Sequence, residues 1–176
     1  MKSGQFEIQE GKSIPYYEET QKRTFLQKLK KIKNTFLMLL AYTCPTAKIR
    51  VCLHRWRGVS IGKNVYIGLF CFLDNLYPEY IYIEDNASIN AGSMILTHFN
   101  PMKRYANIFQ ARVEPVLIKE GAIVSVKSVI LPGVIVGKNA VVSAASVVEK
   151  NVSDCTFVKG NPAKRILHYE ILLENE

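Results

Sequence analysis

Residues 118–153 decide the fold, because they read in groups of six as IKEGAI, VSVKSV, ILPGVI, VGKNAV, VSAASV and VEKNVS. The first position of each group is always β-branched and the fifth is always small: Ile118, Val124, Ile130, Val136, Val142 and Val148, then Ala122, Ser128, Val134, Ala140, Ser146 and Val152. The same register occurs upstream in IGKNVY and IGLFCF from Ile61, and in IEDNAS and INAGSM from Ile83. At ordinary amino-acid composition, six consecutive chance matches have odds of about one in ten thousand or less.

A six-residue unit is one short strand followed by a corner. An ordinary sandwich of alternating strands would instead show a period of two, with turns every 8–12 residues. In each unit the β-branched residue points into the coil, where its stiffness costs little, and the small residue occupies the crowded corner. Gly and Asn in the turns, such as Gly62, Asn86 and Gly121, tolerate left-handed backbone angles. The repeat therefore predicts stacked coils around one aliphatic column.

Composition describes a soluble globular domain with an excess of positive charge. The chain has 176 residues, of which 48% are hydrophobic and 22% charged, so one domain is expected and disorder and collagen-like structure are excluded. A net charge of +8 favours an anionic partner, although charge alone does not choose between nucleic acid, a membrane surface and a phosphate-bearing cofactor. The N-terminus lacks the order of a signal peptide, and the apolar run Thr35–Cys44 is about half as long as a spanning helix. We therefore expect a cytoplasmic protein.

The four cysteines give no sign of a metal or redox site. Cys44, Cys52, Cys71 and Cys155 show no CxxC spacing. We interpret them as buried small apolar residues in a reducing compartment.

The segments outside the repeat predict helices at both ends of the chain. Within residues 18–42 apolar residues recur at helical spacing, with four lysines between them: Phe25, Leu26, Leu29, Ile32, Phe36, Leu37 and Leu40, then Lys28, Lys30, Lys31 and Lys33. This basic amphipathic helix is expected to pack across the end of the coils as a cap; peripheral contact with anionic lipid is the main alternative, ahead of nucleic acid. Near the C-terminus Pro162 can begin a short helix, with an apolar face formed by Ile166, Tyr169, Leu172 and Leu173. The expected organisation is a helical cap segment over 1–57 and a coiled domain over 58–176.

One histidine stands where the repeat is interrupted. His98 begins the insertion HFNPMKRYANIFQARVEP, which runs to Pro115 between two regular blocks. Long loops in compact domains tend to be functional. His54 and His168, by contrast, are expected to be surface or packing residues. From the residues alone, structural and catalytic roles for His98 are equally favoured.

These features resemble a known family. The hexads, the Thr97-His98 pair before the insertion and the turn Gly160-Asn161-Pro162-Ala163-Lys164-Arg165 are similar to the hexapeptide-repeat acyltransferases, and the resemblance covers roughly residues 58–166. It implies a mainly β protein, a left-handed parallel β-helix with an N-terminal amphipathic helix and a short C-terminal helix. It also implies a homotrimer that uses acetyl-CoA as co-substrate and needs no metal.

The resemblance further implies a role for individual residues. His98 would be the general base on an acceptor hydroxyl, a task that suits histidine because a free imidazole with a pKa near 6.5 is available as a neutral base. The backbone N–H of Val126 would stabilise the oxyanion. Residues expected to bind the cofactor are Ser125, Val126, Ala144, Ala145, Lys150, Lys164 and Arg165, and those expected near the acceptor are Asp74, Asn75 and Tyr77. Ser125 and Ser143 stand where the family usually has Gly, which could narrow the CoA groove.

The predicted function is transfer of an acetyl group from acetyl-CoA to a sugar hydroxyl, by family analogy in surface polysaccharide biosynthesis. Streptogramin-type antibiotic acetyltransferases and sugar N-acetyltransferases of the same fold are alternatives. A third is a non-catalytic β-helix scaffold. Whatever its activity, the protein is expected in the cytoplasm, with the inner face of the membrane as an alternative location through the basic N-terminal helix. Scattered histidines disfavour a carbonic anhydrase, which would need three of them around a metal.

Overall fold

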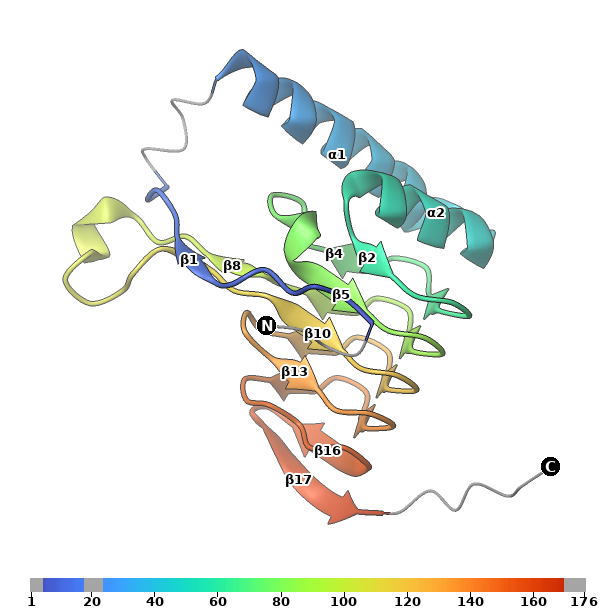
Figure 1. The fold of residues 1–176 in the computed structure, drawn as a ribbon. Helices are drawn as coiled ribbons and strands as arrows, with labels where there is room; N and C mark the ends of the chain where they lie inside the picture. The colour runs from blue at the N-terminus through green and yellow to red at the C-terminus, as the bar shows by residue number, and fades with distance from the viewer. Residues whose placement is uncertain (1–4, 18–23, 170–176) are drawn as a thin grey trace.

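The chain forms a three-sided parallel β-helix with two helices at its N-terminal end (Figure 1). The computed structural model describes residues 5–17 and 24–169. The first sheet contains β2 (Ser60–Ile61), β5 (Ile81–Ile83), β10 (Val116–Ile118) and β13 (Ile135–Val136). The second contains β3 (Tyr66–Ile67), β6 (Ser88–Ile89), β11 (Ile123–Val124), β14 (Val141–Val142), β16 (Thr156–Gly160) and β17 (Ala163–His168). The third contains β4 (Phe72–Leu73), β7 (Met94–Ile95), β12 (Val129–Ile130) and β15 (Val147–Val148).

Successive coils stack in register, as the repeat predicts. Val124 lies beside Ile89 and Val142, and Ile130 lies beside Ile95 and Val148, in parallel pairs. In Figure 1 the first sheet crosses the front from left to right, and the chain returns behind it while descending, which is a left-handed winding. The predicted mainly β coil is therefore confirmed.

The core is the aliphatic column formed by the first hexad positions. Every one of these side chains from Ile118 to Val148 is at most 2% exposed. The small fifth positions lie at corners where neighbouring coils touch. Ser128 Oγ, for example, donates to the carbonyl of Ser143 in the next coil at 2.9 Å, and both Ser128 and Ser146 are fully buried. Larger side chains would not fit at these two positions.

Two helices precede the coils. The second helix, α2 (Ala47–Arg57), covers the end of the column with buried Val51, and α1 (Phe25–Thr43) packs against α2. The predicted cap therefore exists, but α2 makes most of it. Among the described residues, no helix is long and apolar enough to cross a membrane.

The orientation of α1 differs from the prediction. Its apolar row was expected to face the coils, yet the buried side chains of α1 are Asn34 and Ala41. Phe25, Ile32 and Phe36 are each more than 60% exposed. The expectation was wrong because α2, a helix that is not predicted from the sequence, already covers the aliphatic column.

The predicted C-terminal helix is also wrong over its described part. Residues Ala163–His168 form β17, which pairs antiparallel with β16 and closes the lower edge of the second sheet. The edge of β16 offers unpaired backbone groups, and a returning strand satisfies them in a way that a helix cannot. Leu172 and Leu173 lie outside the described residues.

The cysteine prediction holds for one residue in four. Cys71 is buried, Cys44 and Cys155 are partly exposed and Cys52 is exposed, all as free thiols. Cys52 lies on the side of α2 that faces away from the coils, where a residue is exposed whatever its polarity.

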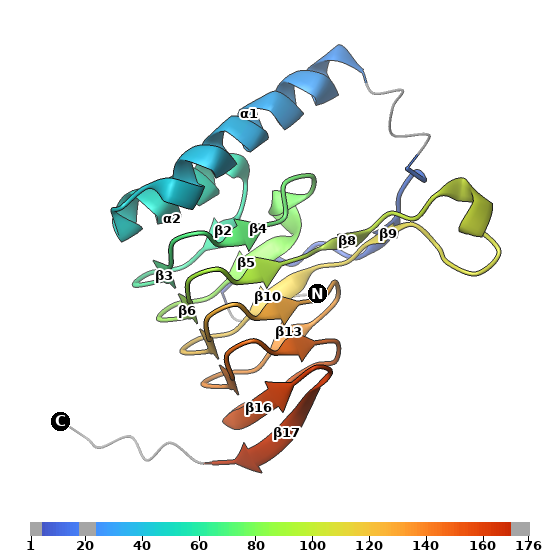
Figure 2. The ribbon, with the colours of Figure 1, turned by 180° about the vertical axis from the view of Figure 1, so that it is seen from behind.

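The insertion forms a hairpin that projects from the side of the coils (Figure 2). Its strands are β8 (His98–Phe99) and β9 (Arg112–Val113), and β1 (Lys12–Ser13) adds to the outer edge of β9. Two 3₁₀ turns accompany it, η2 (Pro78–Tyr80) in the preceding coil and η3 (Lys103–Tyr105) at the tip. The hairpin places His98 at the point where the coil ends and the projection begins.

Candidate active site

His98 and Asp74 form a hydrogen-bonded pair at the base of the hairpin. The imidazole Nδ1 lies 2.5 Å from Asp74 Oδ2. The Asp74 carboxylate is fully buried, whereas the His98 side chain is 23% exposed. Because an ionised carboxylate only accepts hydrogen bonds, Nδ1 carries the proton and Nε2 of the neutral ring is left with a lone pair.

Protein donors hold Asp74 in its ionised form. Its Oδ2 accepts hydrogen bonds from the backbone N–H and hydroxyl of Thr97, at 3.0 and 2.9 Å, and its Oδ1 accepts from the N–H of Leu76 at 2.9 Å. Burial by itself raises the pKa of Asp74, but the hydrogen bond and charge of His98 and the backbone donors outweigh it, so the pKa is lowered. Asp74 is therefore ionised at neutral pH and orients the imidazole.

A second buried pair lies beneath this one. Arg57 Nη2 donates to the carbonyls of Leu73 and Asp74, at 2.9 and 2.7 Å, and Arg57 Nη1 donates to His54 Nδ1 at 2.9 Å. Burial lowers the pKa of Arg57 to about 10 although the charge of Asp74 raises it. Burial, followed by the charges of Arg57 and Arg50, lowers the pKa of His54 to about 3. His54 is thus a neutral packing residue, as expected, and Arg57 fixes the backbone that presents Asp74.

The two other predicted acceptor residues have different environments. The Tyr77 ring packs edge-on against the His98 ring with centroids 5.4 Å apart. Asn75 donates to Thr35 Oγ1 at 2.8 Å and accepts from Arg57 at 3.5 Å. Both ends of the Asn75 amide thus contact protein groups, and its acceptor role stays a prediction.

Most residues predicted to bind the cofactor lie at a different corner from His98. The histidine corner, where the chain passes from the third sheet back to the first, holds His98, Asp74 and Lys150. The Val126 corner, where the chain passes from the second sheet to the third, holds Ser125, Val126, Ala144 and Ala145. The whole third sheet separates these corners within one chain, so one chain does not bring the predicted site together.

The four residues predicted to bind the cofactor at the Val126 corner have short side chains, and Val126 is 45% exposed. Among the described residues, the N–H of Val126 donates no hydrogen bond, whereas its carbonyl accepts from Ala145 at 3.0 Å. The Val126 N–H is therefore available to a ligand.

The basic residues predicted to meet phosphate are exposed. Lys164 and Arg165 lie on β17, the outermost strand of the second sheet, and Lys150 lies at the end of β15. None of the three forms an ion pair with a described acidic residue. They are free to bind phosphate. Lys150 shares a corner with His98 but lies two coils away, and Lys164 and Arg165 lie on the second sheet.

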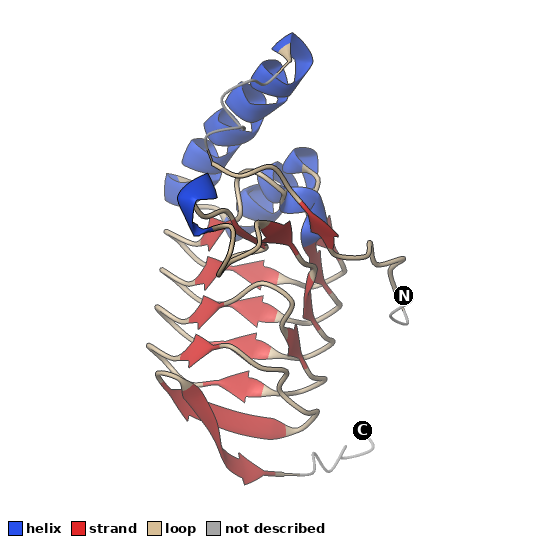
Figure 3. Cartoon of the chain, turned by 90° about the vertical axis from the view of Figure 1, so that its left-hand side faces the viewer, coloured by secondary structure: helices blue, strands red, loops and turns tan. Residues whose placement is uncertain are grey.

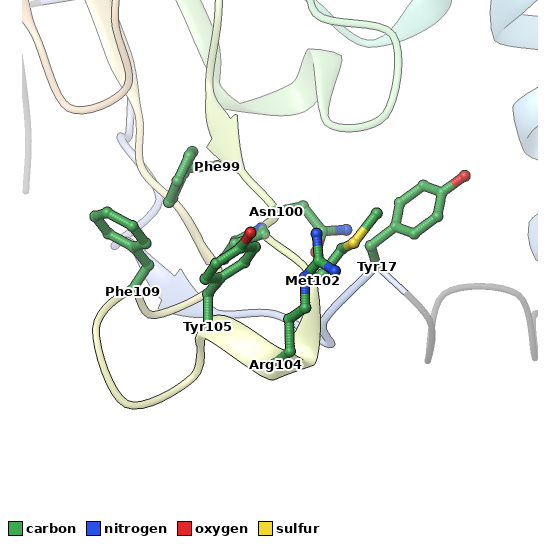
Figure 4. A pocket seen from close by; sticks show the side chains of 8 residues that line it. Tyr17, Phe99, Asn100, Met102, Arg104, Tyr105 and Phe109 are labelled. Atoms are coloured by element: carbon green, nitrogen blue, oxygen red, sulfur yellow. The ribbon is translucent and has the colours of Figure 1, made fainter.

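A separate cavity of about 450 Å³ lies at the tip of the hairpin (Figure 4). Its lining is mainly aromatic: Tyr17, Phe99, Asn100, Pro101, Met102, Arg104, Tyr105 and Phe109. Phe99 follows His98 in β8, and successive strand residues point to opposite faces. The cavity therefore does not contain the His98–Asp74 pair.

Sequence comparison identifies the family. No protein-family model matches the chain. YvoF of Bacillus subtilis strain 168, which is assigned as an acetyltransferase, is 33% identical over 147 residues, covering 83% of this chain and 82% of YvoF. The assigned acetyltransferase SAS0727 of Staphylococcus aureus strain MSSA476 is 31% identical over 134 residues, covering 76% of this chain and 80% of that protein. The chain belongs to the hexapeptide-repeat acetyltransferases.

Solved structures of this family share the fold. A maltose O-acetyltransferase of Clostridium difficile 630 superposes with a TM-score of 0.66 at 22% identity, over 84% of this chain and 90% of that one. A galactoside acetyltransferase in complex with coenzyme A superposes with a TM-score of 0.61 at 17% identity, over 88% and 91% of the two chains. Both confirm the hexapeptide-repeat coil for this acetyltransferase.

Sequence reasoning missed two residues that build the site. Thr97 is fully buried and gives Asp74 two hydrogen bonds, and Arg57 holds the Asp74 turn from α2. Thr97 was visible as the neighbour of His98. Arg57 lies 17 residues from Asp74 in a different element, and only the packing of α2 on the first coil reveals the contact.

Proposed function

We propose that this acetyltransferase transfers an acetyl group from acetyl-CoA to a sugar hydroxyl, in the synthesis of a surface polysaccharide. One observation carries the proposal: His98 is oriented through Nδ1 by a buried, ionised Asp74, and its partly exposed ring leaves Nε2 for an acceptor. The maltose, galactoside and polySia-specific acetyltransferases among the solved neighbours support a sugar acceptor. Acetyl-CoA as donor is supported by a neighbour solved with that molecule.

The pair fits direct transfer without an acyl-enzyme. His98 Nε2 removes the proton from the acceptor hydroxyl, and the oxygen attacks the thioester carbonyl carbon. The N–H of Val126 donates to the oxyanion that develops on the carbonyl oxygen. The C–S bond then breaks, and the imidazolium, stabilised by Asp74, returns its proton to the thiolate of CoA. The products are an acetyl ester and free CoA.

The separation of the two corners supports a trimer. We propose that the histidine corner of one chain faces the Val126 corner of its neighbour, so that each site is completed by two chains. Light scattering should then give three times the chain mass of 20.0 kDa across working concentrations. A monomeric mass that persists at every concentration would contradict both the trimer and the shared site.

The decisive experiment measures thiol release from acetyl-CoA over an array of sugars, with and without His98. In His98→Ala we expect turnover to fall about 10²- to 10⁴-fold, the usual range for a lost general base, with unchanged affinity for acetyl-CoA. His168→Ala is the control, because His168 is exposed on β17 and bonds only to Thr156 among the described residues. A folded, fully active His98→Ala protein would remove His98 from the mechanism.

A second candidate is N-acetylation of an amino sugar. The observation in its favour is a solved neighbour, AntD of Bacillus cereus, an N-acyltransferase that superposes with a TM-score of 0.54 at 21% identity. Amino and hydroxy sugars in the same array separate the two reactions, because mild base hydrolyses an acetyl ester but not an amide. Absence of thiol release with every acceptor would favour a non-catalytic scaffold.

A further inference from the structure

The outer face of α1 is apolar. Residues spaced by four and three along this helix lie on its side away from α2, and their exposed fractions run from 46% to 73%: Phe25, Leu29, Ile32, Phe36 and Leu39. We call these five side chains the outer face of α1. A helix of a globular protein normally turns such a row toward the core. An exposed row of this kind marks a surface that something else covers.

The opposite face of α1 is mixed in polarity, because half-buried Leu37 and Met38 lie on the same side as a buried asparagine. Asn34 and Ala41 are its most buried residues, at 1% exposure each. Asn34 Oδ1 has no hydrogen-bond partner among the described residues. α1 therefore buries one amide without a partner, while five large apolar side chains stay on its outer face.

Positive charge borders the outer face. Lys28 and Lys33 lie on either side of the apolar row by helical spacing, and both are exposed. Residues 25–57, which include both helices, contain eight Lys and Arg and no Asp or Glu. The rest of the chain carries 15 basic and 15 acidic residues. The positive charge of the protein is therefore concentrated on the helical end.

We propose that the outer face of α1 binds the surface of an anionic membrane. An apolar row flanked by lysines is the pattern of a helix that lies in the lipid interface, with its apolar side among the acyl chains and its lysines at the headgroups. A second copy of this chain fits less well. Pairing two outer faces would bring lysines against lysines, with no acidic residue in α1 to compensate.

The position of α1 leaves this face accessible. α1 lies at the very end of the coils, and its N-terminal half extends beyond them (Figure 3). Binding through this face would leave the coils standing away from the membrane. It would also keep Asp74 and His98, which follow β4 and β7 in the two coils nearest the helices, close to the lipid surface.

The test is sedimentation of the full chain with vesicles of phosphatidylcholine, alone or mixed with phosphatidylglycerol. We expect binding to the mixed vesicles, weakened by salt, and little binding to phosphatidylcholine alone. Ile32→Gln/Phe36→Gln should weaken binding at least about ten-fold, because two side chains no longer enter the acyl region. Lys28→Gln/Lys33→Gln should weaken it about five-fold for each lysine lost.

The matched control is Ile166→Gln/Leu167→Gln. These side chains on β17 are also about half exposed, at the opposite end of the coils, and their loss should leave vesicle binding unchanged. Failure of the wild type to bind mixed vesicles would overturn the proposal. Equal binding by the α1 variant and the control would overturn it too. A lower oligomeric mass of Ile32→Gln/Phe36→Gln without lipid would show that a second copy covers the face.

The result is independent of the acetyl-transfer proposal. Vesicle binding is measured without donor or acceptor, so an inactive protein can still bind and an active one can fail to bind. Circular dichroism melting of each variant confirms that α1 remains folded, since glutamine has good helix propensity.

Discussion

Two histidines of this protein use the same ring atom for opposite purposes. His54 and His98 each place Nδ1 within 2.9 Å of a charged side chain, but the partner of His54 is the guanidinium of Arg57 and that of His98 is the carboxylate of Asp74. A guanidinium only donates, so His54 Nδ1 must accept and the ring stays neutral. A carboxylate only accepts, so His98 Nδ1 must donate.

The two histidines therefore differ in the charge of their partner and in their exposure to solvent. His54 is 1% exposed, and a proton on its ring would face Arg57 and Arg50. His98 reaches solvent, and its Nδ1 faces the buried carboxylate of Asp74. Arg57 joins the two regions, because it bonds to His54 and to the backbone of Asp74. We therefore expect different effects when the partner of His98 is changed and when the partner of His54 is changed.

The largest effect is expected when the partner of His98 changes from acceptor to donor. In Asp74→Asn the amide can donate to Nδ1, which moves the ring proton to Nε2 and removes the base. Turnover should fall by about 10²- to 10⁴-fold, the range seen when a triad carboxylate is made neutral. The measurement is thiol release at saturating acetyl-CoA.

The control for this variant is Asp74→Glu, which keeps an acceptor but displaces it. Glu should retain more activity than Asn if proton placement matters, and the affinity for acetyl-CoA should be unchanged in both. Equal turnover in wild type and Asp74→Asn would show that the orientation of His98 by Asp74 is irrelevant to the reaction.

A smaller effect, on stability, is expected from removing the residue that joins the two regions. Arg57→Met leaves the carbonyls of Leu73 and Asp74 and the Nδ1 of His54 without their buried donor. The free energy of unfolding should fall by about 3 kcal/mol, since several buried acceptors become unsatisfied.

Denaturant unfolding measures this free energy, and Arg55→Met is the control. The more exposed Arg55 also bonds to carbonyls, of Ile61 and Gly62, so its loss should cost only about 1 kcal/mol. Equal losses would refute a special role for Arg57.

The coil and the place of His98 beside the hairpin could be predicted from the sequence because both depend on local pattern. Each hexad predicts one strand and one corner, and neighbouring hexads provide its packing partners. Six consecutive repeats therefore predict the same coil. His98 stands out because it occupies the one place where the repeat is interrupted by a long insertion.

What could not be predicted depends on contacts between distant elements. The role of Arg57 depends on how α2 packs on the first coil. The formation of β17 depends on the unpaired edge of β16. The outward turn of α1 has the same origin, because its apolar row fits a core-facing helix equally well until α2 is seen to occupy that place. The placement of the predicted site residues at two different corners could not be predicted either, because the hexads alone do not show at which corner each one begins.

The smallest effect expected here is on the pH dependence of stability, and it tests the neutral state of His54. Its pKa is lowered from 6.5 to about 3 in the folded chain, so below pH 6.5 the unfolded state binds a proton that the folded state does not. The stabilisation from the folded form is complete above pH 6.5 and is lost progressively as the pH falls toward 3. Between pH 6.5 and 5.0 the free energy of unfolding should therefore drop by about 2 kcal/mol on account of this residue.

In His54→Gln the amide oxygen can still accept from Arg57 but takes up no proton, so the difference between wild type and variant should shrink by that amount over the same interval. Denaturant unfolding at pH 7.5, 6.5, 5.5 and 5.0 gives both curves, and since Asp74 and the other carboxylates are present in both proteins, their titration cancels. Parallel curves for the two proteins would mean that the folded and unfolded chains protonate His54 alike, and that Arg57 does not keep this ring neutral.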